Sequence, residues 1–162
     1  MKINQFSPLD YEFSQIIDSI VLMPKKLYYI GKIPEKRLPT IAIVGTRKPT
    51  AYGREVTTQI ATDLARHGVI IVSGMALGVD GLAHRAALDV GGTTIAVQGN
   101  GLARLYPASH RQLGIDIVAA GGAIISEYEP NIAARDFQFL ERNRIVSGLS
   151  DGVLITEASA RS

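Results

Sequence analysis

Five short apolar segments recur along the chain at nearly constant spacing, and this spacing limits the fold more than any other feature. They begin at Ile41, Val69, Ile95, Ala123 and Val153. The starts lie roughly 26–30 residues apart, which is the length of a strand, a helix and their connections. The segments are continuously apolar rather than alternating, so both faces of the sheet should be covered. We therefore predict an α/β fold, a Rossmann-like doubly wound, mostly parallel sheet with helices on both faces.

The stretches between the first apolar segments have helical periodicity. Val56, Ile60 and Leu64 recur every four residues before His67-Gly68, and a second helical pattern runs from Val79 to Val90. Proline is concentrated in residues 1–39, which contain a short helical pattern around 13–21 and a predicted strand at 27–30. We predict that residues 1–39 are a lead-in segment packed on a main domain of residues 40–162.

Composition excludes several classes of protein. The chain has no cysteine, so disulfides, thiolate metal sites and catalytic thiols are excluded. No segment reaches the roughly 18 apolar residues of a membrane span, and no signal peptide is evident, so we expect a cytoplasmic protein without a membrane partner. The net charge is only +2, but every basic residue after Lys48 other than histidine is arginine. Arginine suits bidentate phosphate contacts.

Small and polar residues follow the predicted strands. In a parallel α/β sheet, ligands bind beyond the carboxyl ends of the strands, where backbone amides can approach an anion. The Gly-rich sequences there match neither the dinucleotide-binding fingerprint nor a P-loop, and no metal-ligand spacing is present, so no cofactor or metal is predicted. The candidate phosphate-binding residues after the first three strands are Gly45, Thr46, Arg47, Ser73, Gly74, Met75, Gly99, Asn100 and Gly101.

The segment from Arg135 to Arg144 combines phenylalanine with basic and amide side chains. Aromatic rings stack on the bases of a single strand while arginines follow its backbone. The alternative is a helix whose phenylalanine is in the core and whose arginines face solvent, and the pattern alone does not separate the two. The candidate residues here are Arg135, Phe139, Arg142 and Asn143.

Catalytic patterns are weak. No nucleophile elbow is present, and the three histidines form no recognisable triad. Asp80 and His84 are four residues apart on a predicted helix, so they could form a hydrogen-bonded pair, for which a structural role is favoured over acid–base catalysis. We predict a protein that is not an enzyme.

Taken together, the motifs resemble the DNA-processing protein A family, also called DprA or Smf. The resemblance extends from about Leu27 to the last residue. It is carried by IVGTR at 43–47, SGMALGVDGLAH at 73–84, TIAVQGNG at 94–101, Tyr106-Pro107, Ser126-Glu127 and the segment from Phe139 to Ser150.

The resemblance implies a non-enzymatic protein that binds single-stranded DNA during natural transformation and recombination. Such a protein would protect incoming DNA, help to load the RecA recombinase and act as a homodimer. By position, Gly45, Thr46 and Arg47 would form a phosphate pocket, to which the residues after the second and third strands add. Phe139 would offer its ring to a base, and Arg142 with Asn143 would contact or organise the strand.

Two departures from the family pattern leave other interpretations open. Leu140 stands where the family usually has proline, and the chain stops inside a motif that the family continues, which suggests truncation at the C-terminus. One alternative is a nucleotide-binding sensor or nucleotide-processing protein. Another is an inactive fragment whose open strand edge promotes self-association.

Overall fold

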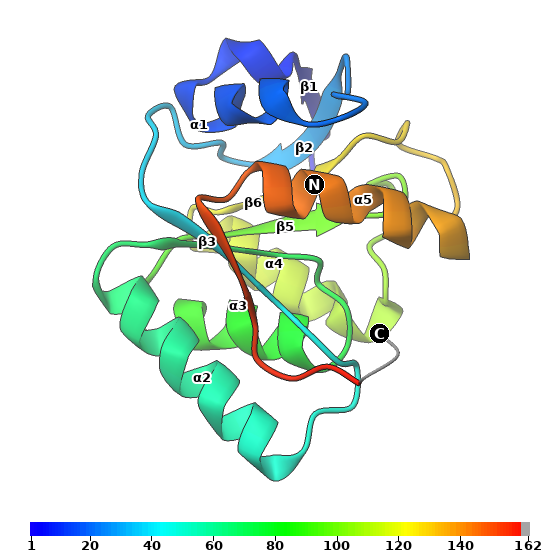
Figure 1. The fold of residues 1–162 in the computed structure, drawn as a ribbon. Helices are drawn as coiled ribbons and strands as arrows, with labels where there is room; N and C mark the ends of the chain where they lie inside the picture. The colour runs from blue at the N-terminus through cyan, green and yellow to red at the C-terminus, as the bar shows by residue number, and fades with distance from the viewer. Residues whose placement is uncertain (160–162) are drawn as a thin grey trace.

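The computed structural model describes residues 1–159, which form one seven-stranded sheet covered by helices (Figure 1). The end of the predicted main domain, including Arg161, lies outside the described residues. The sheet order is β1-β2-β6-β5-β4-β3-β7. The strands are β1 (Asn4–Phe6), β2 (Leu27–Gly31), β3 (Thr40–Val44), β4 (Ile70–Ser73), β5 (Thr94–Gln98), β6 (Ala123–Ser126) and β7 (Gly152–Ile155).

The five strands that the apolar spacing predicts, β3 to β7, are mutually parallel. β2 pairs antiparallel with β6, and β1 pairs antiparallel with β2. The predicted Rossmann-like α/β fold is confirmed. β1 had no counterpart among the predicted elements, because its three residues carry only one buried apolar side chain, Phe6.

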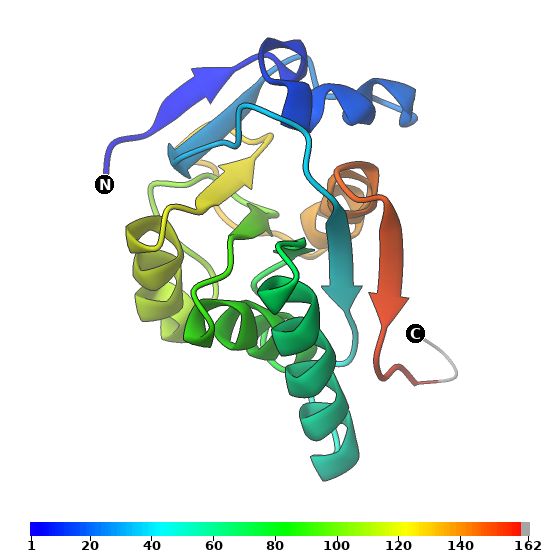
Figure 2. The ribbon, with the colours of Figure 1, turned by 90° about the vertical axis from the view of Figure 1, so that its left-hand side faces the viewer.

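Helices cover the two faces of the sheet (Figure 2). Apolar side chains of α2, α3 and α4 pack on one face, and those of α5 and the N-terminal helical turns pack on the other. The helices are α1 (Glu12–Gln15), α2 (Ala51–Arg66), α3 (Val79–Asp89), α4 (Arg111–Ala119) and α5 (Asp136–Gly148), with 3₁₀ turns η1 (Pro8–Asp10), η2 (Ile16–Ser19) and η3 (Ala108–His110).

The N-terminal segment is held against α5 by burial and by one arginine. Phe13 and Ile17 are fully buried in the same cluster as Leu149. Arg37 donates to the carbonyl oxygens of Phe13 and Leu149, at 3.3 and 2.8 Å, and to Asp151 Oδ1 at 2.6 Å. The division into a lead-in segment and a main domain stays a prediction, although β1 and β2 extend the main sheet.

The predicted helical pattern around 13–21 is shorter in the structure. Helical turns end at Ser19, because Ile20 has an extended backbone with φ −81° and ψ 147°. In the part of the chain described, none of the helices combines the length and the apolar character needed to cross a bilayer.

Candidate nucleic-acid interface

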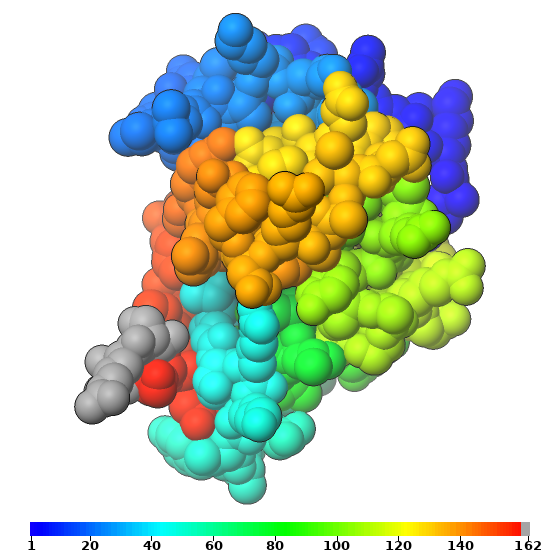
Figure 3. Space-filling model, turned by 90° about the vertical axis from the view of Figure 1, so that its right-hand side faces the viewer, coloured from blue at the N-terminus to red at the C-terminus, as the bar shows by residue number. Residues whose placement is uncertain are grey.

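The carboxyl ends of β3, β4 and β5 meet at one edge of the sheet, where the chain turns from strand to helix. Figure 3 shows the segment after β3 (cyan), α5 (orange) and the segment after β5 (yellow-green) gathered on one face of the molecule. Two adjoining hollows lie here, which we together call the edge pocket. They are lined by Gly45, Thr46, Arg47, Lys48, Gly74, Ala76, Leu77, Asp80, Tyr106, Pro107, Phe139, Leu140, Arg142 and Asn143.

Two aromatic rings and one arginine lie in a row in the edge pocket. The ring centroids of Tyr106 and Phe139 are 5.2 Å apart with an interplanar angle of 34°. The Arg47 guanidinium carbon lies 5.9 Å from the centroid of the Phe139 ring. The backbone amide of Tyr106 donates to Gln98 Oε1 at 3.0 Å, which fixes the segment after β5 relative to the strand. The row thus offers an aromatic surface next to a positive charge.

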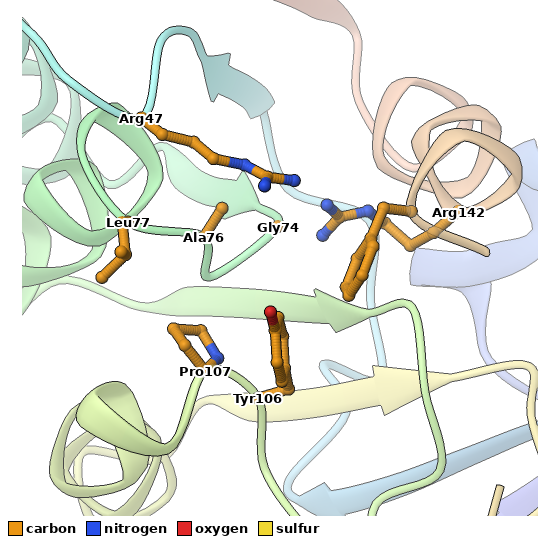
Figure 4. A pocket seen from close by; sticks show the side chains of 8 residues that line it. Arg47, Gly74, Ala76, Leu77, Tyr106, Pro107 and Arg142 are labelled. Carbon is orange, nitrogen blue, oxygen red and sulfur yellow. The ribbon is translucent and has the colours of Figure 1, made fainter. Parts of the chain in front are cut away.

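Arg142 reaches the same pocket from α5 on the opposite side. In Figure 4 the guanidinium groups of Arg47 and Arg142 point toward one another. Arg142 is buried, and its Nη1 donates to the carbonyl oxygen of Val97 at 2.5 Å, while its Nε has no partner among the described residues. Burial lowers the pKa of Arg142, the charge of Asp80 raises it, and the charge of Arg47 lowers it further. Two like charges that face each other favour an anion between them.

Asp80 organises the turn after β4. Its Oδ2 accepts hydrogen bonds from the backbone amides of Gly74 and Ala76, at 3.1 and 3.2 Å. Burial raises the pKa of this carboxyl, while Arg142 and these amides lower it. The Gly74 amide is therefore already engaged inside the protein.

Ser73 and Met75 are placed in the interior. The Ser73 hydroxyl donates to the carbonyl oxygen of Ile43 at 2.6 Å, and the Met75 side chain is fully buried against α4. Their predicted part in strand binding stays a prediction. Of the three candidates in this turn, Gly74 lines the pocket, where it lies against the guanidinium group of Arg142.

Gly45 and Thr46 line the pocket beside Arg47. The Thr46 amide donates to the carbonyl oxygen of Glu157 at 2.8 Å, and the Thr46 hydroxyl oxygen accepts from the Lys48 amide at 3.2 Å. These bonds fix the backbone from which the exposed Arg47 side chain projects.

The Gly99-Asn100-Gly101 segment supports the pocket from β5. A Cβ on Gly99 would lie only 2.8 Å from the Phe139 ring, so glycine lets the ring approach the strand. Asn100 is 3% exposed, and its Nδ2 donates to the carbonyl oxygens of Gly101 and Arg104, at 2.9 and 2.7 Å. None of the three lines the edge pocket.

The remaining two candidates differ in position. Asn143 lines the pocket next to Arg142, whereas Arg135 is exposed just before α5 and outside the pocket lining. The structure adds residues that were not among the candidates, namely Lys48, Ala76, Leu77, Asp80, Tyr106, Pro107 and Leu140. The Tyr106-Pro107 pair was visible in the sequence as part of the resemblance, but its place beside Phe139 depends on the fold.

The expected pairing of Asp80 with His84 is wrong, because each has its own partner. His84 is fully buried, and its Nδ1 lies 2.7 Å from the Thr94 hydroxyl. That hydroxyl donates to the Ile71 carbonyl oxygen, so Nδ1 of His84 carries the proton. Burial lowers the pKa of His84 to about 3. Both side chains brace α3.

Comparison with known proteins identifies relatives over nearly the whole chain. The family model of DNA recombination-mediator protein A matches residues 4–162. Protein Smf from Synechocystis is 41% identical over 96% of this chain and 40% of its own length. DNA processing protein DprA from Streptococcus pneumoniae is 38% identical over 99% of this chain and 56% of its own length. The chain thus spans about half, or less, of these relatives.

Solved structures agree with this assignment. The structure of DNA processing protein A from Helicobacter pylori, reported for its single-stranded DNA binding mode, has a TM-score of 0.86 at 35% identity and covers all of this chain and 72% of its own. DprA from Streptococcus pneumoniae has a TM-score of 0.85 at 35% identity, with 100% and 56% covered. On the matched residues and the shared fold, the chain belongs to the DNA recombination-mediator protein A family.

Proposed function

We propose that the chain binds single-stranded DNA without sequence preference in the edge pocket, as part of DNA processing in transformation and recombination. The observation that carries this proposal is the pair of facing guanidinium groups, Arg47 and Arg142, next to stacked aromatic rings. A phosphate between the guanidinium groups would relieve their mutual repulsion and accept charge-assisted hydrogen bonds. The reported single-stranded DNA binding of the Helicobacter pylori relative supports the same substrate.

The aromatic row supplies the part of the site that suits a base. Tyr106 is 46% exposed, so its ring is available to stack on a flat ligand next to Phe139. Stacking tolerates any base, because each has a π-face. The pocket places no exposed carboxylate beside the rings, since Asp80 is 5% exposed and bonded to the backbone.

Holding a strand, rather than reacting with it, fits the chemistry of the pocket. The two side chains best suited to acid–base work, Asp80 and His84, are buried and bonded to the scaffold. His110 likewise bonds through Nδ1 to the Met75 carbonyl oxygen at 2.9 Å. We extend the proposal to the wider role that the family resemblance implies: protection of incoming DNA in the cytoplasm, help in loading RecA, and action as a homodimer.

The direct test is binding of oligo-dT to the parent chain and to Arg47→Ala, measured by fluorescence anisotropy over a range of salt concentrations. Removing one phosphate contact should weaken binding and reduce the slope of log K against log salt by about 1. Arg66→Ala is the matched control, because Arg66 is exposed at the far end of α2 and, among residues 1–159, forms an ion pair with Asp63 alone.

Two outcomes would overturn the proposal. If Arg47→Ala binds oligo-dT as the parent does, the strand does not use this pocket. If a mononucleotide raises the melting temperature of the parent and oligo-dT does not bind, the site is that of a nucleotide sensor.

A further inference from the structure

A further hollow adjoins the edge pocket at Tyr106. It has a volume of about 500 Å³ and is formed by the segment after β5 and the segment that leads from β6 to α5. Tyr106 lines both this hollow and the edge pocket, so this residue stands between them. We call this further hollow the loop hollow. Its lining includes Asn100, Ala103, Arg104, Pro130, Ile132 and Ala133.

Backbone hydrogen bonds join the two loops that form the loop hollow. The Gly101 amide donates to the Ile132 carbonyl oxygen at 2.8 Å, and the Ala103 amide donates to that of Pro130 at 2.9 Å. These bonds tie the two loops together. A hollow whose walls are joined by backbone hydrogen bonds is preformed, so a ligand entering it does not have to order the loops.

The chemistry of the lining suits a nucleobase better than a phosphate. The lining is mostly apolar and includes Tyr106, and a volume of this size is typical of small-molecule sites. Polar groups are few. Asn100 is 3% exposed and held by two hydrogen bonds from Nδ2, while its Oδ1 accepts none from the described residues. Because Oδ1 is itself buried, the hollow presents mainly apolar surface to a ligand.

A basic side chain stands at the loop hollow, where a strand would carry its backbone. Arg104 is exposed and forms no ion pair with any residue from 1 to 159. The loop hollow thus combines apolar surface with the exposed Arg104, as the edge pocket combines Phe139 with Arg47. The edge pocket and the loop hollow share Tyr106, so one strand can pass from the first to the second.

We propose that the loop hollow is a second base-binding subsite for the same single strand, which crosses Tyr106 from the edge pocket. This inference rests on the proposed function and adds to it the course of the strand. One base stacks in the row of Phe139 and Tyr106, and a base further along the strand enters the loop hollow. Arg104 contacts the backbone there.

The test uses oligo-dT in which one abasic position is moved along the strand. With the parent chain, affinity should fall at two separate positions, by about tenfold at each for the loss of one stacked base. Ala133→Trp and, independently, Ala103→Trp fill the loop hollow from exposed positions. With either variant, sensitivity at the second position should disappear, while sensitivity at the first remains.

Ala119→Trp is the matched control, because Ala119 is exposed at the end of α4 and lines neither hollow. A melting curve for each variant shows whether it is folded. If the parent shows only one sensitive position, or both tryptophan variants keep two, the loop hollow is not a subsite. If the parent does not bind oligo-dT at all, the proposed function itself fails, which is a separate result.

Discussion

The guanidinium group of Arg142 lies against the Cα of Gly74, in the space that a side chain at position 74 would occupy. A methyl group there would overlap Nη1 of Arg142. Gly74→Ala should therefore displace Arg142 from the Val97 carbonyl oxygen and reduce affinity for oligo-dT by about tenfold or more. Because Arg142 is buried, the free energy of unfolding should also fall, by about 1–3 kcal/mol. Anisotropy titrations and urea denaturation measure the two effects.

Gly152→Ala is the control for this substitution. A Cβ at Gly152 would meet only Ile41 Cδ1 at 3.4 Å, an ordinary contact. It should leave binding unchanged. Parent-like affinity of Gly74→Ala would mean that the position of Arg142 does not matter to the strand.

Phe139 and Phe137 lie two residues apart on α5 but have different surroundings. Phe139 lines the edge pocket beside Tyr106, whereas Phe137 is 51% exposed and outside its lining. Phe139→Leu should weaken oligo-dT binding by about tenfold, because it removes a stacking partner worth roughly 1–3 kcal/mol. Phe137→Leu should bind like the parent. Equal losses in both variants would argue against stacking at Phe139.

Arg37 connects the N-terminal segment to α5 and β7, through the carbonyl oxygens of Phe13 and Leu149 and the carboxylate of Asp151. Arg37→Ala leaves these acceptors without their donor, so the free energy of unfolding should fall by about 1–3 kcal/mol. Hydrogen exchange should rise first in residues 12–19. Lys36→Ala, at an exposed neighbouring position, should leave both measurements unchanged.

His84 should make the stability of the protein fall in acid. Its pKa is about 3 in the folded protein, against about 6.5 in an unfolded chain, so the unfolded state binds the proton more readily. The stabilising contribution is complete above pH 6.5 and is lost as the pH falls toward 3. At pH 5 the loss should be about 2 kcal/mol. The raised pKa of Asp80 acts in the opposite direction, because its contribution is lost as the pH rises.

The effect of His84 is isolated by comparison with His84→Asn, which keeps a donor near Thr94 and does not titrate. Urea denaturation of both proteins between pH 7 and about 4.5 gives two stability curves. The parent should lose more free energy of unfolding than the variant over this range. Parallel curves would show that His84 does not carry the pH dependence.

The parallel strands of the sheet could be predicted because their sequence signal is strong. Each of β3 to β7 is an apolar segment at regular spacing, and chirality limits how such units connect. β1 has no comparable signal. It pairs with β2, and Phe6 contacts Tyr29, and both interactions join residues that are distant in sequence.

The candidate site could be predicted only in part, because some of its contacts depend on the fold. Arg47 and Phe139, both predicted as binding residues, line the edge pocket, because a charged or aromatic side chain beyond a strand or on a helix is recognisable in the sequence. The engagement of the Gly74 amide by Asp80 could not be seen, because it depends on how a turn and a helix face each other. The place of Tyr106 in the edge pocket could not be predicted either, because only the fold brings it beside Phe139.

Helix α5 contributes side chains both to the edge pocket and to the core that holds the N-terminal turns. Phe139 and Arg142 reach the edge pocket, while Ile145 and Leu149 pack in the core that holds Phe13 and Ile17. One helix thus joins the first twenty residues of the chain to the edge pocket. A partner bound to the N-terminal turns would therefore contact the same helix that positions Phe139 and Arg142.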